Sequence, residues 1–162
     1  MSSADIDRVD KGILYLLQQN ARSHTTADIG EKVGVSSSTV ANRINDLESA
    51  GVITGYFPSI DYEKTDLRHH VLAIATVPIT EQGDTADDIL SIAGVVSVRE
   101  LLTSKQNLSI ELVGHTQDDI ERSLTALNET GVDVERMVMM KRHRFQPYDH
   151  FGKQYTSEAE SR

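Results

Sequence analysis

Three stretches near the start of the chain carry apolar residues at spacings of three and four, which is the pattern of amphipathic helices. They cover residues 5–20, 27–33 and 36–50. Gly34 follows the second stretch and Gly51 follows the third, as residues that end helices do. The pattern therefore predicts three short helices.

Residues 52–60 mix apolar positions with Gly55 and Pro58, which predicts a short strand or hairpin leading out of the helical unit. After a polar stretch, strand-like and helical patterns follow in the order βαββαβ. That order is the one of a ferredoxin-like fold, in which two helices cover one face of a four-stranded antiparallel sheet. The predicted elements lie at residues 71–77, 84–92, 95–102, 108–113, 117–130 and 132–140.

The predicted fold class is therefore α+β with two domains. A winged helix-turn-helix domain covers residues 1–60 and a linker covers 61–69. The βαββαβ domain takes residues 70–144, and its uncovered sheet face needs a cover. Pro147, Gly152 and the polar residues 157–162 predict that residues 145–162 form an extended or disordered tail.

The second and third predicted helices are joined by a turn at residues 34–36, which is the spacing of a helix-turn-helix motif. Opposite its apolar stripe, the third helix carries uncharged polar groups that can donate to phosphates or base edges. Arg43 on the flank can reach a phosphate or a guanine. In the alternative interpretation, residues 36–39 only cap the helix and Arg43 pairs with Asp46 or Glu48. The polar face consists of Ser38, Asn42, Asn45 and Ser49.

The charge balance argues against a nucleic-acid partner, because phosphate contacts are cationic. The chain has 25 acidic and 16 basic residues and a net charge of −9. Both halves are acidic, with 6 bases and 9 acids up to Lys64 and 10 bases and 16 acids after it. Such acidity is typical of proteins that work in the salt-rich cytoplasm of a salt-adapted archaeon, where salt screens charge repulsion.

Other features of the sequence exclude whole classes of site. The chain has no cysteine, so it has no disulfide and no thiolate ligand. Its longest apolar run, residues 71–77, is too short to cross a membrane, and no export signal is evident, so we expect a cytoplasmic protein. Met137, Met139 and Met140 are expected to fill the sheet or a dimer contact.

The histidines form two groups without the tight spacing of metal ligands. These groups are His69 with His70, and His143 with Asp149 and His150. We therefore expect no metal, no cofactor and no catalytic residue.

Five segments of the N-terminal half, in their order, resemble the opening domain of the Lrp/AsnC family of transcriptional regulators. They are residues 7–14, 20–22, 35–40, 43–48 and 51–56. The βαββαβ pattern resembles that family's ligand-sensing and dimerising domain, so the resemblance covers residues 5–144. It implies a sequence-specific regulator of double-stranded DNA, a homodimer formed by packing two sheets face to face, and often larger rings. The residues then expected to contact DNA are Arg22, Ser36, Ser37, Ser38, Thr39, Asn42, Arg43 and Asn45.

The resemblance also implies a small amino acid as effector, bound near a Gly-x-x-Asp turn between the second and third strands. This chain has residues 104–107 there, without the glycine and with an amide in place of the carboxylate. Either the effector differs, for example by offering a carboxylate to Lys105, or no effector binds and the turn is structural. The candidate effector-binding residues are Thr103, Ser104, Lys105 and Asn107.

Two other functions remain open. Subunits of siroheme decarboxylase resemble the same architecture, with an Asn-His-x-Tyr-Asn-Leu-like stretch, but residues 104–108 lack the histidine and the tyrosine. The acidic N-terminal half is also compatible with a sensing or assembly protein that no longer binds DNA. We expect a regulator and not an enzyme.

Overall fold

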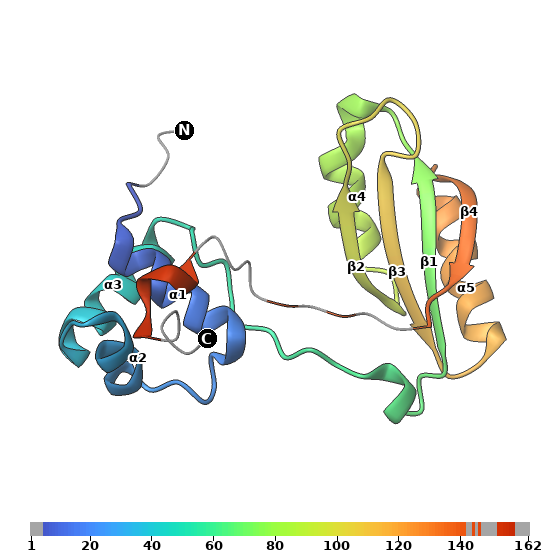
Figure 1. Ribbon diagram of the computed structural model, residues 1–162. Helices are drawn as coiled ribbons and strands as arrows, with labels where there is room; N and C mark the ends of the chain where they lie inside the picture. The colour runs from blue at the N-terminus through green and yellow to red at the C-terminus, as the bar shows by residue number, and fades with distance from the viewer. Residues whose placement is uncertain (1–4, 142–143, 145, 147–151, 158–162) are drawn as a thin grey trace. The chain divides into compact units, whose positions relative to one another are not determined.

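The computed structural model describes residues 5–141, 144, 146 and 152–157 of the 162-residue chain. It divides into two compact units, which Figure 1 shows. The first unit combines the N-terminal residues up to Pro58 with residues from the C-terminus, and we call it the helix-turn-helix domain. The second unit runs from Ser59 to His143, and we call it the sheet domain.

The helix-turn-helix domain contains the three predicted helices, α1 (Arg8–Asn20), α2 (Thr26–Val33) and α3 (Ser37–Ser49). Each helix begins at a polar N-cap whose side chain accepts a backbone N–H of the first turn. The apolar stripes of the three helices meet in one core. Its buried members are Ile13, Tyr15, Leu16, Ile29 and Val40.

The turn between α2 and α3 depends on two glycines. Gly34 has a φ of 78°, in the left-handed region, and its N–H donates to the carbonyl of Gly30 over 2.8 Å. At Gly30 itself an added Cβ would lie 2.6 Å from the carbonyl oxygen of Val35. This close approach sets the angle at which α3 leaves α2.

The prediction of a strand or hairpin at residues 52–60 is wrong. The segment leaves α3 through turns and continues without strand hydrogen bonds. Gly55 and Pro58 interrupt it, and no neighbouring strand in the described residues offers a ladder partner. Phe57 is consequently 85% exposed.

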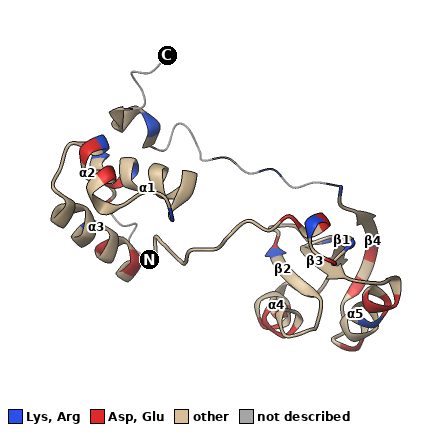
Figure 2. Cartoon of the chain, turned by 90° about the horizontal axis from the view of Figure 1, so that it is seen from below, with Lys and Arg blue, Asp and Glu red and all other residues tan. Residues whose placement is uncertain are grey.

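The sheet domain confirms the predicted ferredoxin-like order. Its antiparallel strands are β1 (His69–Thr76), β2 (Val95–Glu100), β3 (Leu108–Gly114) and β4 (Asp133–Met139), arranged β2-β3-β1-β4. Helices α4 (Gln82–Leu90) and α5 (Gln117–Glu129) cover one face of this sheet, as Figures 1 and 2 show. Figure 2 also shows Asp and Glu positions, in red, along both of these helices.

Burial along β1 alternates as expected for a sheet with one covered face. Val71, Ala73 and Ala75 are buried in the core under the helices. Leu72 and Ile74 are only half-buried and point to the face that α4 and α5 leave open. We call this the open sheet face.

The predicted linker and tail contain short 3₁₀ turns. The linker carries η1 (Tyr62–Lys64), and η2 (Ile79–Glu81) precedes α4. Contrary to the expectation of an extended or disordered tail, residues 152–157 are folded around η3 (Lys153–Tyr155), with Thr156 buried. The other residues of the predicted tail lie outside the described ones, apart from 146. In the part of the chain that the structure describes, no helix is long and apolar enough to cross a bilayer.

The capping interactions at the N-terminus of α5 predict that the stability of the sheet domain depends on pH. Asp119 has a pKa lowered to about 2, because the backbone N–H and hydroxyl of Thr116 and the guanidinium of Arg122 stabilise its charged form. A lowered pKa stabilises the fold above the unfolded value of 3.8, and this contribution is lost as the pH falls toward 2. We expect the urea midpoint of the sheet domain to fall over this range, and to fall less in Asp119→Asn. Equal pH slopes in both proteins would contradict the assignment.

Candidate nucleic-acid interface

The outer face of α3 presents exposed polar side chains. Ser37, Ser38, Asn42 and Asn45 are exposed, as is Ser49 in the last turn. Within the described residues, neither the Asn42 nor the Asn45 amide has a hydrogen-bond partner. An exposed amide offers a donor and an acceptor together, the pair that reads the major-groove edge of adenine.

The first residues of α3 act partly as a helix cap. The Ser36 hydroxyl accepts the backbone N–H of Thr39 at 3.2 Å and lies 2.8 Å from the Thr39 hydroxyl. It also lies 3.0 Å from the Ser38 hydroxyl. Ser36 and Thr39 therefore serve the capping role that the alternative interpretation expected, which leaves Ser37 and Ser38 as the outward-facing hydroxyls of this turn.

The structure gives Arg43 partners that neither interpretation named. Its guanidinium lies 2.9 Å from a carboxylate oxygen of Asp7 and 3.3 Å from Asp10, both at the start of α1. The expected surface pairs with Asp46 and Glu48 are wrong. Arg43 thus joins α3 to the start of α1, and its guanidinium is directed to these two carboxylates while it stays partly exposed.

The two aspartates that bind Arg43 are also held by hydrogen bonds to each other's backbone. The carboxylate of Asp7 accepts the backbone N–H of Asp10, and the carboxylate of Asp10 accepts that of Asp7. The N–H of Asp10 and the charge of Arg43 lower the pKa of Asp7. Asp10 is only 4% exposed, so its carboxylate bonds these partners in place of water.

A second contact fixes the chain just after α3. The Tyr56 hydroxyl donates to a carboxylate oxygen of Glu48 over 2.8 Å. Partial burial and this bond raise the pKa of Tyr56 to about 12, so the hydroxyl stays protonated and keeps donating. Glu48 is therefore engaged with Tyr56 and not with Arg43.

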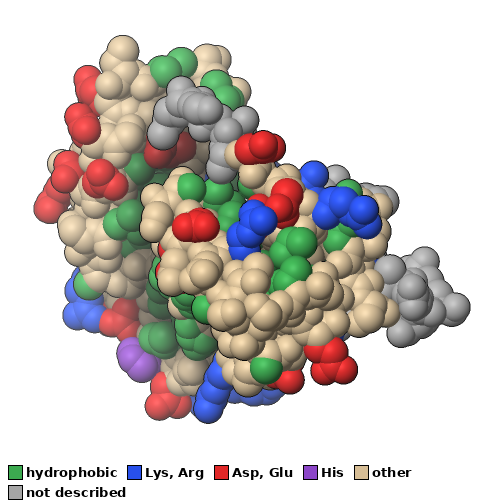
Figure 3. Space-filling view, turned by 90° about the vertical axis from the view of Figure 1, so that its left-hand side faces the viewer, with side chains coloured by type: hydrophobic (Ala, Val, Ile, Leu, Met, Phe, Trp, Pro, Cys, Tyr) green, Lys and Arg blue, Asp and Glu red, His purple; other side chains and the backbone are tan. Residues whose placement is uncertain are grey.

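The remaining predicted DNA contact, Arg22, lies in the loop between α1 and α2. The side chain of Asn20 accepts the backbone N–H groups of Arg22 and Ser23, each at 3.2 Å, which fixes the loop. The Arg22 side chain is exposed. Figure 3 shows acidic and basic groups scattered among hydrophobic and other uncharged surface, with no continuous basic patch on the face it presents.

The candidate effector turn places its four residues in two environments. Thr103, Ser104 and Lys105 are exposed, whereas Asn107 is fully buried. The Asn107 side chain accepts the N–H of Val77 at 3.0 Å and donates to the Val77 carbonyl at 2.8 Å. Both of its polar groups are thus used inside the domain, at the exit of β1.

The same turn is closed by a polar network at its surface. Gln106 has a φ of 52°, and its backbone N–H donates to the hydroxyl of Thr76 over 2.6 Å. Glu135 on β4 accepts bonds from the Thr76 hydroxyl and the Gln106 amide, and these bonds lower its pKa. The turn has a defined shape, and Lys105 projects from it.

The histidine groups do not assemble with other ligands. Among the described residues no cluster of three or more His, Asp and Glu side chains could hold a metal ion. His143, Asp149 and His150 lie outside the described residues. His70 packs edge-on against Tyr62, and its Nε2 lies 3.6 Å from Glu111 on the open sheet face.

Sequence reasoning missed Asp7 and Asp10 as partners of Arg43. Their spacing of three, at the start of a predicted helix, is the signal of a reciprocal cap and could have marked both as buried acceptors. It also missed Tyr155, one of the four aromatic residues in the predicted tail.

Comparison with known proteins agrees with this geometry. The winged helix-turn-helix DNA-binding family matches residues 6–54. The regulator YezC of Bacillus subtilis is 47% identical over 68 residues, which cover 42% of this chain and only 47% of that relative. The HTH-type transcriptional regulator LysM of Sulfurisphaera tokodaii is 32% identical over 137 residues, 81% of this chain and 95% of the relative.

Two further comparisons extend over most of the chain. The HTH-type transcriptional regulator LrpA of Pyrococcus horikoshii is 30% identical and matches 78% of this chain and 86% of its own. The feast or famine regulatory protein of M. tuberculosis, solved with L-methionine, has the same fold, with a TM-score of 0.72 at 22% identity over 90% of this chain and 99% of its own. The chain therefore belongs to the Lrp/AsnC family of helix-turn-helix transcriptional regulators.

Proposed function

We propose that this regulator reads DNA with the polar face of α3 inserted in the major groove. Asn42 and Asn45 contact base edges, because their amides are exposed and unbonded. Ser37, Ser38 and Arg22 contact phosphates on either side, where hydroxyl and guanidinium donors suit the backbone. Ser36 and Thr39 position the helix, and Arg43 supports it from behind through Asp7 and Asp10. The free amides on α3 are the observation that carries this proposal.

The acting form in this proposal is a homodimer joined through the open sheet face. Leu72 and Ile74 of β1 point to this face, beside Val138 of β4, and among the described residues no helix of the sheet domain lies over them as α4 and α5 do on the other side. A second copy would bury these side chains and bring two copies of α3 to one duplex. Paired recognition helices read palindromic half-sites.

We also propose that the turn around Lys105 meets a small effector through that residue. Thr103, Ser104 and Lys105 are exposed donors at one end of the sheet, and they suit the carboxylate of an amino acid or a related acid. Asn107 then acts only by shaping the turn, since its amide is bonded to Val77. The relative solved with L-methionine supports an amino acid as the chemical class.

The net charge fits a cytoplasm rich in salt. At −9 the chain repels DNA at low ionic strength, and screening at high ionic strength weakens this repulsion. We propose that the protein is adapted to such conditions. The enzyme alternative has no support in these relatives, which are named as regulators.

Replacing Asn42 with alanine tests the readout directly. We expect a loss of about 1–3 kcal/mol in binding to the preferred site, together with a relaxed preference at one base position, because an amide that pairs with adenine is removed. Competition binding to sites that differ at single positions measures both effects. Asn128→Ala on α5, an exposed asparagine of the other domain, is the matched control. An unchanged base preference in Asn42→Ala would refute the assignment.

A further inference from the structure

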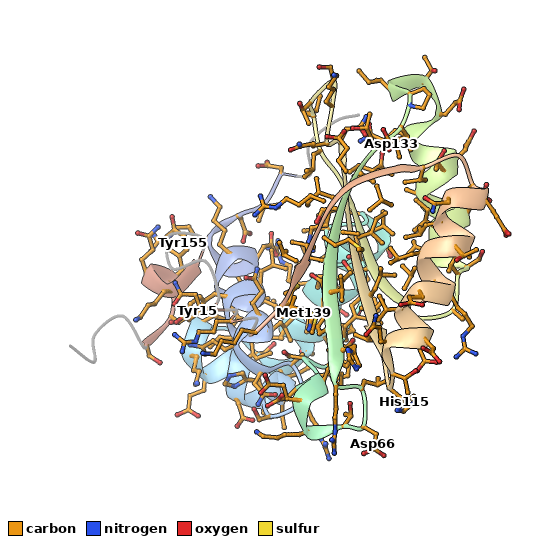
Figure 4. All side chains as sticks on the ribbon, turned by 90° about the vertical axis from the view of Figure 1, so that its right-hand side faces the viewer. Tyr15, Asp66, His115, Asp133, Met139 and Tyr155 are labelled. Carbon is orange, nitrogen blue, oxygen red and sulfur yellow. The ribbon has the colours of Figure 1, made fainter. Side chains whose placement is uncertain are left out.

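The last described segment of the chain, Gly152–Ser157, lies on α1 although it is distant from it in sequence; we call it the C-terminal segment. Figure 1 shows η3 beside α1, and Figure 4 labels Tyr155 and Tyr15 on these two elements. A Cβ added at Gly152 would lie 1.8 Å from the carbonyl oxygen of Lys11 and 2.7 Å from Cβ of Tyr15. Only glycine allows this approach of the two backbones.

Further contacts follow the same stripe of α1. The ring of Tyr155 lies beneath two cations, with the Arg8 guanidinium 5.3 Å and the Lys11 ammonium 6.0 Å from its centroid. Gly12 faces the Tyr155 carbonyl and the Thr156 methyl, which a Cβ there would meet at 3.3 and 3.5 Å. The residues of α1 that receive the segment are therefore Arg8, Lys11, Gly12 and Tyr15, at helical positions i, i+3, i+4 and i+7.

The C-terminal segment has its own internal order. The backbone N–H and the hydroxyl of Thr156 both donate to the carbonyl of Lys153, at 3.0 and 2.9 Å. Thr156 is buried, and its side chain leaves no polar group unpaired. A buried and fully bonded Thr156 together with an obligatory glycine fits a segment that packs stably on α1.

This contact changes how the two domains are connected. The chain leaves the helix-turn-helix domain after Pro58, forms the sheet domain, and returns to α1 at Gly152. Met140 still belongs to the sheet domain, since its N–H donates to the carbonyl of His70. The helix-turn-helix domain is thus attached to the sheet domain at two points of the sequence, and a body held at two points has fewer accessible orientations than one held at a single point.

The helix that receives the segment is also the one that supports α3. Asp7 and Asp10 of α1 hold Arg43 of α3 on a neighbouring side of the helix. A restraint on α1 is therefore a restraint on the recognition helix.

We propose that the C-terminal segment is a second tether that limits the orientations of the helix-turn-helix domain relative to the sheet domain. In a dimer it fixes the spacing of the two half-sites that the protein accepts. The effect on half-site spacing rests on the proposed DNA-binding function, whereas the limit on domain orientation does not.

The test uses full-length Gly152→Val, which removes the fit against Lys11, with Gln154→Ala in the same turn as the exposed control. Because the chain has no cysteine, Glu31→Cys and Asp87→Cys place one spin label in each domain. Cleavage after Tyr155 by chymotrypsin reports release of the segment. We expect Gly152→Val to broaden the distance distribution between the labels and Gln154→Ala to leave it unchanged.

A second measurement separates this proposal from the DNA-binding function. The measurement uses duplexes that carry two half-sites at varied spacing. In Gly152→Val the ratio of the affinity for the best spacing to the affinity for other spacings should fall about tenfold, and the base preference within each half-site should stay the same. An unchanged distance distribution with the segment released would overturn the tether. Unfolding of the helix-turn-helix domain in Gly152→Val would also overturn it, since the segment would then be part of the fold itself. Failure of the wild-type protein to bind any duplex would contradict the DNA-binding function, and the label distances would still test the tether.

Discussion

Replacing Asn107 with alanine is expected to lower the free energy of unfolding of the sheet domain by about 2–4 kcal/mol, because it leaves two buried backbone groups without partners. The side chain bonds both the N–H and the carbonyl of Val77, and it is fully buried. The missing amide also leaves a small cavity. Chemical unfolding followed through the sheet domain measures the loss.

The matched control is Ser104→Ala in the same turn, where the side chain is exposed. We expect its stability to stay within about 0.5 kcal/mol of the wild-type value. If Asn107→Ala were as stable as the wild type and had lost only a response to an effector, the side chain would be a ligand contact and the structural assignment would be wrong.

Replacing Arg43 with methionine is expected to cost about 2–3 kcal/mol in the stability of the helix-turn-helix domain, somewhat less than for a fully buried pair because Arg43 is partly exposed. The substitution leaves the carboxylate of Asp10 buried without its counter-charge. DNA affinity should fall through the smaller folded fraction and the looser α3. The dependence of binding on salt should keep its slope, since no phosphate contact is removed.

Arg122→Met provides the control, because Arg122 pairs with Asp119 on an exposed surface of α5. Such surface pairs contribute roughly 0–1 kcal/mol. A salt slope reduced by about one in Arg43→Met, at unchanged stability, would show that Arg43 holds a phosphate in the complex.

The sequence was sufficient for the elements whose patterns are local. Stripes such as Val40, Ile44 and Leu47 predicted the helices, and the strand-like patterns of residues 71–77, 95–102, 108–113 and 132–140 predicted the four strands of the sheet. The polar face of α3 followed from helical geometry alone, and Asn42 and Asn45 are exposed as that geometry requires.

The features that escaped prediction depend on contacts between distant residues. Arg43 finds Asp10 across 33 positions, and local spacing favoured Asp46 and Glu48 instead. The apolar residues of 52–60 suggested a strand, but a strand exists only where a neighbour completes its ladder. Gly152 was assigned to an extended or disordered tail because its requirement for glycine arises from Lys11 on another element.

The most direct test of the central claim is a selection of genomic DNA fragments by the purified full-length protein, at low and at near-molar potassium salt. Binding by paired α3 helices predicts a palindromic motif, with half-site centres roughly 10 base pairs apart or a multiple of this, retained at high salt. In Asn42→Ala the same motif should lose information at one position of each half-site. The absence of any enriched motif for the wild-type protein at both salt concentrations would contradict the claim that α3 reads DNA.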